Sequence, residues 1–271
     1  MDNRPIGVFD SGVGGLTVVN ALSKVLPNES IYYVGDTARV PYGNKSKSSI
    51  LKFSEQITEW LLNQNCKMII IACNTASSLA LSHLESNLST SIIGVIDPGI
   101  KCAQIETKNK QIGVLGTRAT INSNIYYNRF KELDKEILVI SKACPLFVPL
   151  VEEGFISGHI PLSVINYYLN EIKKTDIDTI ILGCTHYPLL ATAISEVLGS
   201  SIKLIDSSLA TADRVKRILE DNNLLASRNL SEINCYVTDY TKTFKKIVDR
   251  FFKSNINSIK KNRCILNILN F

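Results

Sequence analysis

The chain has 271 residues, of which 45 % are hydrophobic and 20 % are charged, as in ordinary globular proteins. It holds no run of about eighteen consecutive apolar residues, and its first residues lack the basic and then apolar pattern of a signal peptide; both observations favour a cytoplasmic protein without a membrane partner. Much of the net charge of +5 lies in a basic tail that includes Lys260, Lys261 and Arg263. Such a tail is more often a solvated chain end than a nucleic-acid site, so no nucleic-acid partner is expected.

The first part of the chain alternates short apolar runs with amphipathic stretches. The apolar runs predict four strands, at Ile6–Phe9, Ile31–Val34, Met68–Ala72 and Ile92–Val95. Between them, Ile50–Leu62 carries apolar residues at helical spacing. Strands that are apolar on both faces and separated by helices are typical of parallel sheets covered on both sides.

The same alternation continues further along the chain. Strands are expected at Ile112–Leu115, Ile137–Ile140, Thr179–Leu182 and Ile202–Ile205, and Leu162–Ile172 has helical spacing. A third unit, with a helix at Leu209–Leu219, a strand at Cys235–Val237 and a helix at Thr241–Phe252, is expected to return to the first domain. The remaining segment, Ser254–Phe271, is left without an assignment.

Three matches in the same order indicate an internal duplication. Ile6–Ser11 is similar to Ile112–Thr117, Cys73 corresponds to Cys184, and Ile96–Pro98 corresponds to Ile205–Ser207. We therefore expect an α/β protein with two pseudo-symmetric domains of similar topology, each a mainly parallel sheet flanked by helices, and a site in the cleft between them. The first domain is expected to comprise residues 1–97 and 207–271, and the second residues 98–206.

Two of the seven cysteines stand directly after matching buried strands. Cys73 is followed by Asn74 and Thr75, and Cys184 by Thr185 and His186. Ligands of parallel sheets bind beyond the carboxyl ends of the strands, so the two thiols are expected to flank one cleft. The seven cysteines form no CxxC pair, which predicts free thiols in a reducing compartment.

Other polar residues also follow the predicted strands. Asp10 and Asp36 are each compatible with a simple helix cap, Glu152 and Glu153 with surface positions, and the glycine cluster Gly12–Gly15 with a tight turn that exposes backbone N–H groups. The glycine cluster matches neither common phosphate-loop pattern. Cys73, Cys184, His186 and Asp10 do not have a usual zinc spacing, so no metal is expected.

Five segments together resemble the glutamate racemases of the aspartate/glutamate racemase superfamily. The resemblance extends from Ile6 to about Asp206, and its segments are Gly7–Thr17, Val34–Gly43, Ala72–Ala76, Pro149–Gly154 and Leu182–Pro188. It implies an isomerase that interconverts L- and D-glutamate without a cofactor and supplies D-glutamate for peptidoglycan in the cell wall. It also implies a homodimer.

The resemblance further implies which residues form the site. The catalytic set comprises the thiols of Cys73 and Cys184, assisted by Asp10, Asp36, Glu152 and His186, with motif alignment favouring Glu152 over Glu153. The substrate-binding set comprises Asp10, Ser11, Pro41, Tyr42, Gly43, Asn74, Thr75, Thr185 and His186.

The expected chemistry needs one thiolate to remove a proton and one thiol to return a proton on the opposite face of the same carbon. A free thiol with a pKa of about 8.5 is only a few per cent ionised at neutral pH, so a helix N-terminus after each cysteine is expected to lower that pKa. We expect Asp10, with Asp36, to assist Cys73, and His186, with Glu152, to assist Cys184.

Three alternatives stay open on the sequence alone. Another racemase of the same superfamily would act on aspartate or hydantoins. A thiol oxidoreductase would use reversible bonding between Cys73 and Cys184. A binding module would use the basic tail after Phe252, since some members of the family inhibit DNA gyrase.

Overall fold

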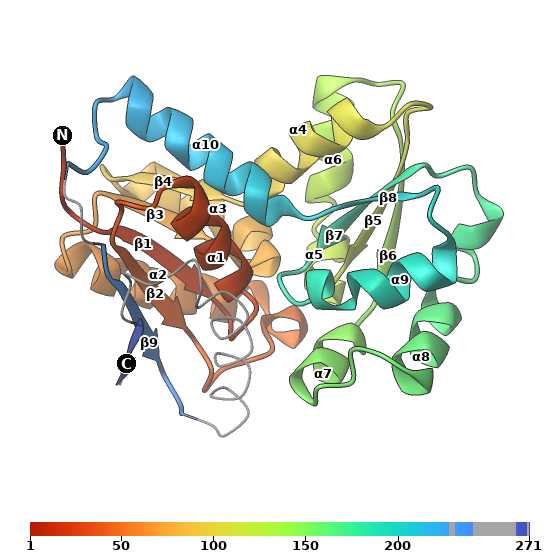
Figure 1. The fold of residues 1–271 in the computed structure, drawn as a ribbon, viewed down its shortest axis with the longest axis horizontal. Helices are drawn as coiled ribbons and strands as arrows, with labels where there is room; N and C mark the ends of the chain where they lie inside the picture. The colour runs from red at the N-terminus through yellow and green to blue at the C-terminus, as the bar shows by residue number, and fades with distance from the viewer. Residues whose placement is uncertain (228–230, 241–263, 270) are drawn as a thin grey trace.

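The computed structural model describes residues 1–227, 231–240, 264–269 and 271, and folds them into two lobes. Each lobe is built on one parallel β-sheet with helices on both faces (Figure 1). The predicted α/β fold with two parallel sheets is therefore confirmed.

The first lobe contains a six-stranded sheet in the order β10-β9-β2-β1-β3-β4. All of its neighbouring strands are parallel, and Ile6 on β1 lies beside Ile31 on β2 and Met68 on β3. The strands are β1 (Ile6–Asp10), β2 (Ile31–Gly35), β3 (Met68–Ile71), β4 (Ser91–Gly94), β9 (Ile233–Val237) and β10 (Cys264–Ile268).

Successive side chains of these strands enter two different cores, because side chains alternate between the faces of a sheet. Val8 and Ile70 pack with α1 (Leu16–Val25) and α10 (Ser207–Asp221). Phe9 and Ile71 pack on the other face. The helices there are α2 (Lys47–Asn63) and α3 (Asn74–Asn87). Burial on both faces explains why these strands read as continuous apolar runs.

The second lobe repeats this arrangement around a four-stranded parallel sheet in the order β6-β5-β7-β8. Leu115 and Leu182 face one core, and Val114 and Ile181 face the other. The strands are β5 (Gln111–Gly116), β6 (Leu138–Ala143), β7 (Thr179–Gly183) and β8 (Lys203–Ile205). The helices are α4 (Ile96–Glu106), α5 (Arg118–Asn122), α6 (Ile125–Leu133), α7 (Phe147–Glu152), α8 (His159–Leu169) and α9 (Ala191–Leu198).

The two sheets share one strand order. The run β2-β1-β3-β4 corresponds to β6-β5-β7-β8, so β3 and β7 occupy equivalent places. Cys73 and Cys184 come directly after Ala72 and Gly183 at the ends of these two strands. The matching order agrees with an internal duplication.

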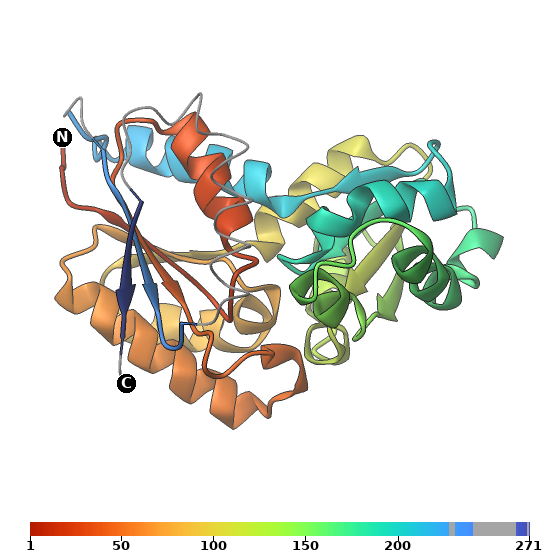
Figure 2. The same cartoon turned by 60° about the horizontal axis from the view of Figure 1, so that its bottom comes forward.

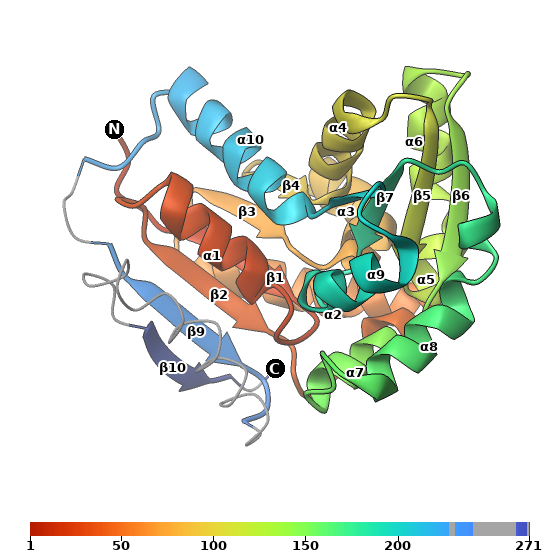
Figure 3. The same cartoon turned by 45° about the vertical axis from the view of Figure 1, so that its right-hand side comes forward.

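The chain crosses between the lobes twice. It passes from β4 into α4, which packs on the second sheet, and returns from β8 into α10, which packs on α1 and α4 (Figure 3). It then adds β9 beside β2 and β10 beside β9, at the edge of the first sheet (Figure 2). The limits given above for the two domains stay a prediction.

All nine predicted strands are present, with ends that differ by a few residues. The helices expected at Ile50–Leu62 and Leu209–Leu219 correspond to α2 and α10. The helix expected at Leu162–Ile172 ends earlier, as α8, and is followed by the 3₁₀ turn η2 (Ile172–Lys174). The expected helix at Thr241–Phe252 lies outside the described residues, and β10 occupies part of the segment left without an assignment.

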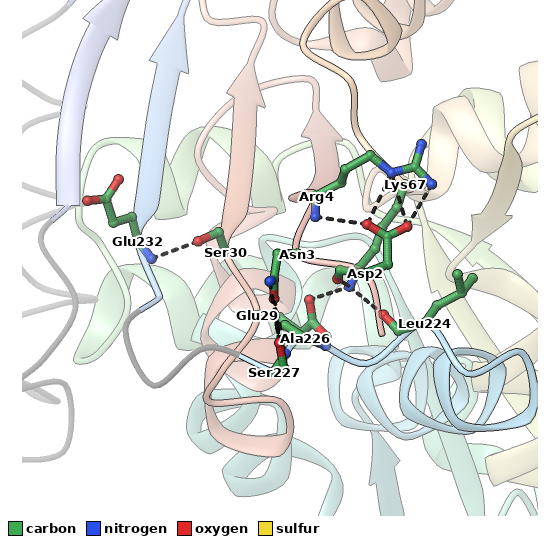
Figure 4. Close-up of polar contacts among 10 residues, drawn as sticks. All are labelled: Asp2, Asn3, Arg4, Glu29, Ser30, Lys67, Leu224, Ala226, Ser227 and Glu232. Carbon is green, nitrogen blue, oxygen red and sulfur yellow. Dashed lines mark hydrogen bonds and ion pairs between the residues drawn. The ribbon is translucent and has the colours of Figure 1, made fainter.

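A buried ion pair ties the chain together at the end of the first lobe remote from the strand carboxyl ends (Figure 4). Lys67 Nζ lies 2.7 Å from Glu29 Oε2, and the two side chains are 0 % and 2 % exposed. Lys67 also donates to the backbone carbonyls of Asp2 and Leu224, both at 2.7 Å. Glu29 Oε1 accepts from the backbone N–H of Ala226 at 2.7 Å. The pair thus joins the N-terminus, β2, β3 and the segment after α10.

None of the helices in the described part of the chain is both long and apolar enough to cross a membrane.

Candidate active site

A cavity of about 300 Å³, measured with its opening to solvent, lies where the carboxyl ends of the two sheets face each other. This is the place where parallel sheets bind their ligands. Both cysteines line this one cavity, Cys73 from the first lobe and Cys184 from the second. The full lining is Ser11, Val40, Pro41, Tyr42, Gly43, Cys73, Asn74, Thr75, Thr117, Val148, Cys184, Thr185 and His186.

Cys73 is the N-cap residue of α3. Its sulfur accepts a hydrogen bond from Ala76 N at 3.5 Å, and its thiol donates to Ser11 Oγ at 3.7 Å. Burial, followed by the nearby Asp10 charge, raises the pKa of the Cys73 thiol to about 12, although the Ala76 and Ser11 contacts lower it. The helix N-terminus therefore lowers the pKa of Cys73 as expected, but burial and the Asp10 charge outweigh it and favour a neutral thiol.

Cys184 has a different local structure. No α-helix begins at the residue after it, contrary to the expectation from sequence. The 3₁₀ turn η3 (Tyr187–Leu190) comes first, and Tyr187 N bonds to the Cys184 carbonyl at 3.0 Å. Pro188 lies in the first turn of η3, where its missing N–H costs no hydrogen bond.

The partner of Cys184 is an imidazole instead of a helix N-terminus. His186 Nδ1 lies 3.9 Å from Cys184 Sγ, and His186 Nε2 lies 3.4 Å from Glu152 Oε1. The second contact has the distance of an ion pair without the geometry of a hydrogen bond. Burial lowers the pKa of His186, but the contacts with Cys184 and Glu152 outweigh it and raise the pKa to about 10. The imidazole beside Cys184 therefore carries a positive charge at neutral pH.

Asp10 connects the two lobes beneath the cavity. It is the last residue of β1 and is fully buried. One carboxylate oxygen accepts from Gly12 N at 3.1 Å, and the other accepts from Thr185 Oγ1 of the second lobe at 3.2 Å. Asp10 therefore stands behind the lining residues, close enough to Cys73 for its charge to act on that thiol.

Asp36 is fully buried and stands behind Tyr42. It accepts hydrogen bonds from the Tyr42 hydroxyl, from Arg39 Nε at 2.8 Å and from Thr238 Oγ1 at 2.9 Å. Burial, and then the Asp36 charge, raise the pKa of Tyr42 well above its ordinary value, so its hydroxyl stays protonated. The contacts of Asp36 thus lead to the cavity through Tyr42.

Two glycines allow the lobes to meet. A Cβ on Gly14 would lie 2.3 Å from Thr185 Oγ1 and 2.7 Å from His186 Nδ1. A Cβ on Gly43 would lie 2.6 Å from the Cβ of Thr117. The glycine turn expected from the sequence is present before α1, and at Gly14 its main use is this close approach to the second lobe.

Sequence reasoning missed several residues of the site. Thr117 lines the cavity and forms a triangle of hydroxyl contacts with Thr75 and Thr120, at 2.9 to 3.1 Å. Tyr126 OH accepts from Asn74 Nδ2 of the other lobe at 2.8 Å. Thr117 is the residue that the internal duplication pairs with Ser11, so that alignment could have found it; Tyr126 has no comparable signal in the sequence.

The structure gathers most of the predicted site residues at one place. Cys73, Cys184 and His186 line the cavity, while Asp10, Asp36 and Glu152 contact residues that line it. Of the predicted binding residues, all except Asp10 are in the lining: Ser11, Pro41, Tyr42, Gly43, Asn74, Thr75, Thr185 and His186. Within the described ranges, no group of three or more His, Cys, Asp or Glu side chains is arranged to hold a metal ion.

Comparison with known proteins agrees with this geometry. The family model for Asp/Glu/hydantoin racemases matches residues 15–215. The chain is 47 % identical over 244 residues to a glutamate racemase from Sulfurihydrogenibium sp., covering 90 % of this chain and 92 % of the relative.

Two solved structures are also similar. Glutamate racemase isoform RacE1 from Bacillus anthracis has a TM-score of 0.93 and 36 % identity, covering 100 % of this chain and 99 % of the other. Glutamate racemase from Francisella tularensis, solved in complex with D-glutamate, has a TM-score of 0.91 and 41 % identity, covering 100 % and 98 %.

Proposed function

The chain belongs to the Asp/Glu/hydantoin racemase family, among its glutamate racemases, and on that premise we propose that it interconverts L- and D-glutamate through a two-cysteine mechanism. The observation that carries the mechanism is the presence of two thiols from two different lobes in one buried cavity. One sulfur removes the α-proton, and the other returns a proton to the opposite face of the resulting carbanion.

The unlike surroundings of the two sulfurs support one thiol and one thiolate. Cys73 is buried beside the Asp10 carboxylate, which favours its neutral form. Cys184 is buried 3.9 Å from the charged imidazole of His186 and is the sulfur to which we assign the base in the first direction of the reaction. For turnover in the reverse direction the protonation states exchange, and Asp10 is the carboxylate placed to receive the Cys73 proton.

The carbanion needs donors where negative charge develops. The hydroxyl of Ser11, which accepts from Cys73, and the second N–H of the Asn74 amide line the cavity and supply such donors in a buried place. Preorganised donors act most strongly where water is excluded.

We extend the proposal to the organisation and role of the protein. Residues 1–97 with 207–271, and 98–206, form two domains that enclose the substrate, and the protein works as a homodimer. Its D-glutamate serves peptidoglycan synthesis. Family membership supports these three statements, and growth of a D-glutamate auxotroph on the cloned gene tests the last of them.

Deuterium incorporation at Cα tests the proposed reaction. In heavy water without added cofactor, L-glutamate is expected to become D-glutamate that carries deuterium at Cα, and D-glutamate to give deuterated L-glutamate. A parallel sample with aspartate separates the neighbouring substrate class. Rapid exchange of aspartate with none of glutamate would contradict the proposal, and so would retention of the original hydrogen in the inverted product.

Glu152→Gln is expected to shift the pH profile in one direction of the reaction. Removing the charge beside His186 lowers the raised pKa of that imidazole, so the imidazolium that supports the Cys184 thiolate is lost at a lower pH. The basic limb of kcat/KM should move to lower pH by up to about one unit for the enantiomer whose proton Cys184 removes.

Glu153→Gln is the matched control for this prediction. No ion pair of Glu153 is present among the described residues, so its profile should coincide with that of the unmodified enzyme. Equal shifts in the two variants would contradict a specific role of Glu152 beside His186.

Gly14→Ala is expected to lower kcat/KM about 10- to 100-fold without unfolding the protein. Its methyl group would press on Thr185 and His186, and overpacking of this kind costs about 1–3 kcal/mol. Gly12→Ala is a control on the same turn, because its Cβ would meet only Val40, at 3.3 Å. Steady-state kinetics and thermal unfolding measure both variants, and equal kinetic losses in the two would argue against the steric explanation.

A further inference from the structure

The C-terminal part of the chain holds the loop that forms one wall of the cavity. This loop follows β2 and contributes Val40, Pro41, Tyr42 and Gly43 to the lining. Just after β9, Thr238 Oγ1 accepts from Ala38 N at 2.9 Å.

A neighbouring pair of bonds holds the start of the same loop. Thr37 Oγ1 donates to the Asp239 carbonyl at 2.5 Å and accepts from Asp239 N at 2.9 Å. Together with the Thr238 contacts, these bonds join the start of the loop to the segment that follows β9.

Arg39 is the central residue of this contact. Its Nε donates to Asp36, and its Nη1 donates to Gln56 Oε1 of α2 at 2.7 Å. Asp36 in turn accepts from the Tyr42 hydroxyl. The planar, directional donors of Arg39 therefore orient the Asp36 carboxylate. Asp36 in turn orients the hydroxyl of Tyr42, a residue of the cavity wall.

The last residue of the chain lies against this guanidinium. Arg39 Cζ is 4.3 Å from the ring centroid of Phe53 and 5.3 Å from that of Phe271. Phe271 comes two residues after Leu269, whose N–H bonds to the Val237 carbonyl at 2.7 Å. Pairing of β10 with β9 therefore brings the terminal aromatic ring to Arg39, and cation–π contact with two rings restrains the guanidinium plane.

We propose that Arg39 and Phe271 are positioning residues for Tyr42, so that the C-terminal residue of the chain adjusts substrate binding through Arg39 and Asp36. This inference rests on the proposed function for its assay. The ring of Phe271 limits the orientations of Arg39, Arg39 orients Asp36, and Asp36 orients the Tyr42 hydroxyl. Neither positioning residue lines the cavity, so both act through Tyr42.

Phe271→Leu tests the proposal on the full chain with glutamate as substrate. Loss of one exposed cation–π contact is expected to raise KM about two- to fivefold and to leave kcat within about twofold. The Tyr42 hydroxyl donates to Asp36 and not to the charge that develops on the substrate, so this wall contributes to binding of substrate and transition state alike. Phe271→Tyr keeps the aromatic face and should restore the original KM. A general loss of stability would not distinguish leucine from tyrosine at this position.

A double-mutant cycle with Arg39→Lys tests whether Phe271 acts on Tyr42 through Arg39. Lysine keeps the charge but loses the planar fork, so the effect of Phe271→Leu on KM should disappear in the Arg39→Lys background. Ile268→Ala on the same strand, with a side chain that is 63 % exposed, is the matched control and should leave KM unchanged.

The outcomes separate this inference from the proposed function. Racemisation of glutamate by the unmodified enzyme tests the function alone. An unchanged KM in Phe271→Leu, equal effects of Phe271→Leu and Ile268→Ala, or an additive cycle with Arg39→Lys would each overturn the positioning role while the function stands.

Discussion

Replacing Cys73 or Cys184 by serine is expected to lower racemisation of glutamate about 10²- to 10⁴-fold, the usual contribution of a positioned acid or base. A hydroxyl ionises far less readily than a thiol, so serine fills the position without acting as a base. Both cysteines are buried and line one cavity, one from each lobe. Loss of either residue should therefore stop inversion.

The informative result is the exchange that each variant keeps. In heavy water, Cys73→Ser should still exchange the Cα hydrogen of the enantiomer that Cys184 deprotonates, and Cys184→Ser should exchange that of the opposite enantiomer. Each remaining sulfur returns deuterium to the face from which it took hydrogen. We thus expect exchange without inversion, for opposite enantiomers in the two variants.

Cys102→Ser provides the control, since Cys102 is a half-buried thiol outside the cavity. It should keep the activity of the unmodified enzyme. Exchange of the same enantiomer in both active-site variants, or equal residual inversion in both, would contradict a mechanism with one cysteine on each face of the substrate carbon.

Most of the fold could be predicted because its strands are buried on both faces. Runs such as Met68–Ile71 and Thr179–Gly183 are apolar throughout, and their order along the chain fixes a parallel arrangement with helical crossovers. β10 was not predicted, because it is a short strand at the edge of the first sheet. Its strand structure depends on pairing with β9, and the local pattern of apolar residues does not reveal that pairing.

The site was predictable where strand ends determine it. Cys73 and Cys184 follow equivalent strands, so the fold itself brings them together. The functions of polar residues behind the lining depend on contacts far apart in the sequence, such as Thr238 with Asp36, and no local pattern encodes them. The pKa of Cys73 illustrates the same limit: the helix N-terminus was visible in the sequence, whereas the burial that outweighs it was not.

Lys67→Met is expected to lower the free energy of unfolding by about 3–5 kcal/mol, the cost of leaving one partner of a buried ion pair without the other. The Glu29 carboxylate would stay buried without its cation (Figure 4). The carbonyls of Asp2 and Leu224 would lose the ammonium donor that now joins them. Such a change removes a large part of the stability of an ordinary domain, and urea unfolding followed by circular dichroism measures it.

A second substitution distinguishes the charge from the packing. Glu29→Gln removes the negative charge and keeps an oxygen that can accept from Ala226 N, so Lys67→Met combined with Glu29→Gln should recover part of the stability that Lys67→Met alone loses. Lys203→Met is the comparison at the surface: its partner Glu106 is 3.4 Å away and both side chains are exposed, so the change in unfolding free energy should be much smaller. Two results would contradict the unpaired Glu29 charge as the cause of the destabilisation. Lys67→Met could prove no more destabilising than Lys203→Met, or adding Glu29→Gln to Lys67→Met could lower the stability further. The recovery is expected to be incomplete, because methionine at position 67 has no donor for the two carbonyls that Lys67 now satisfies.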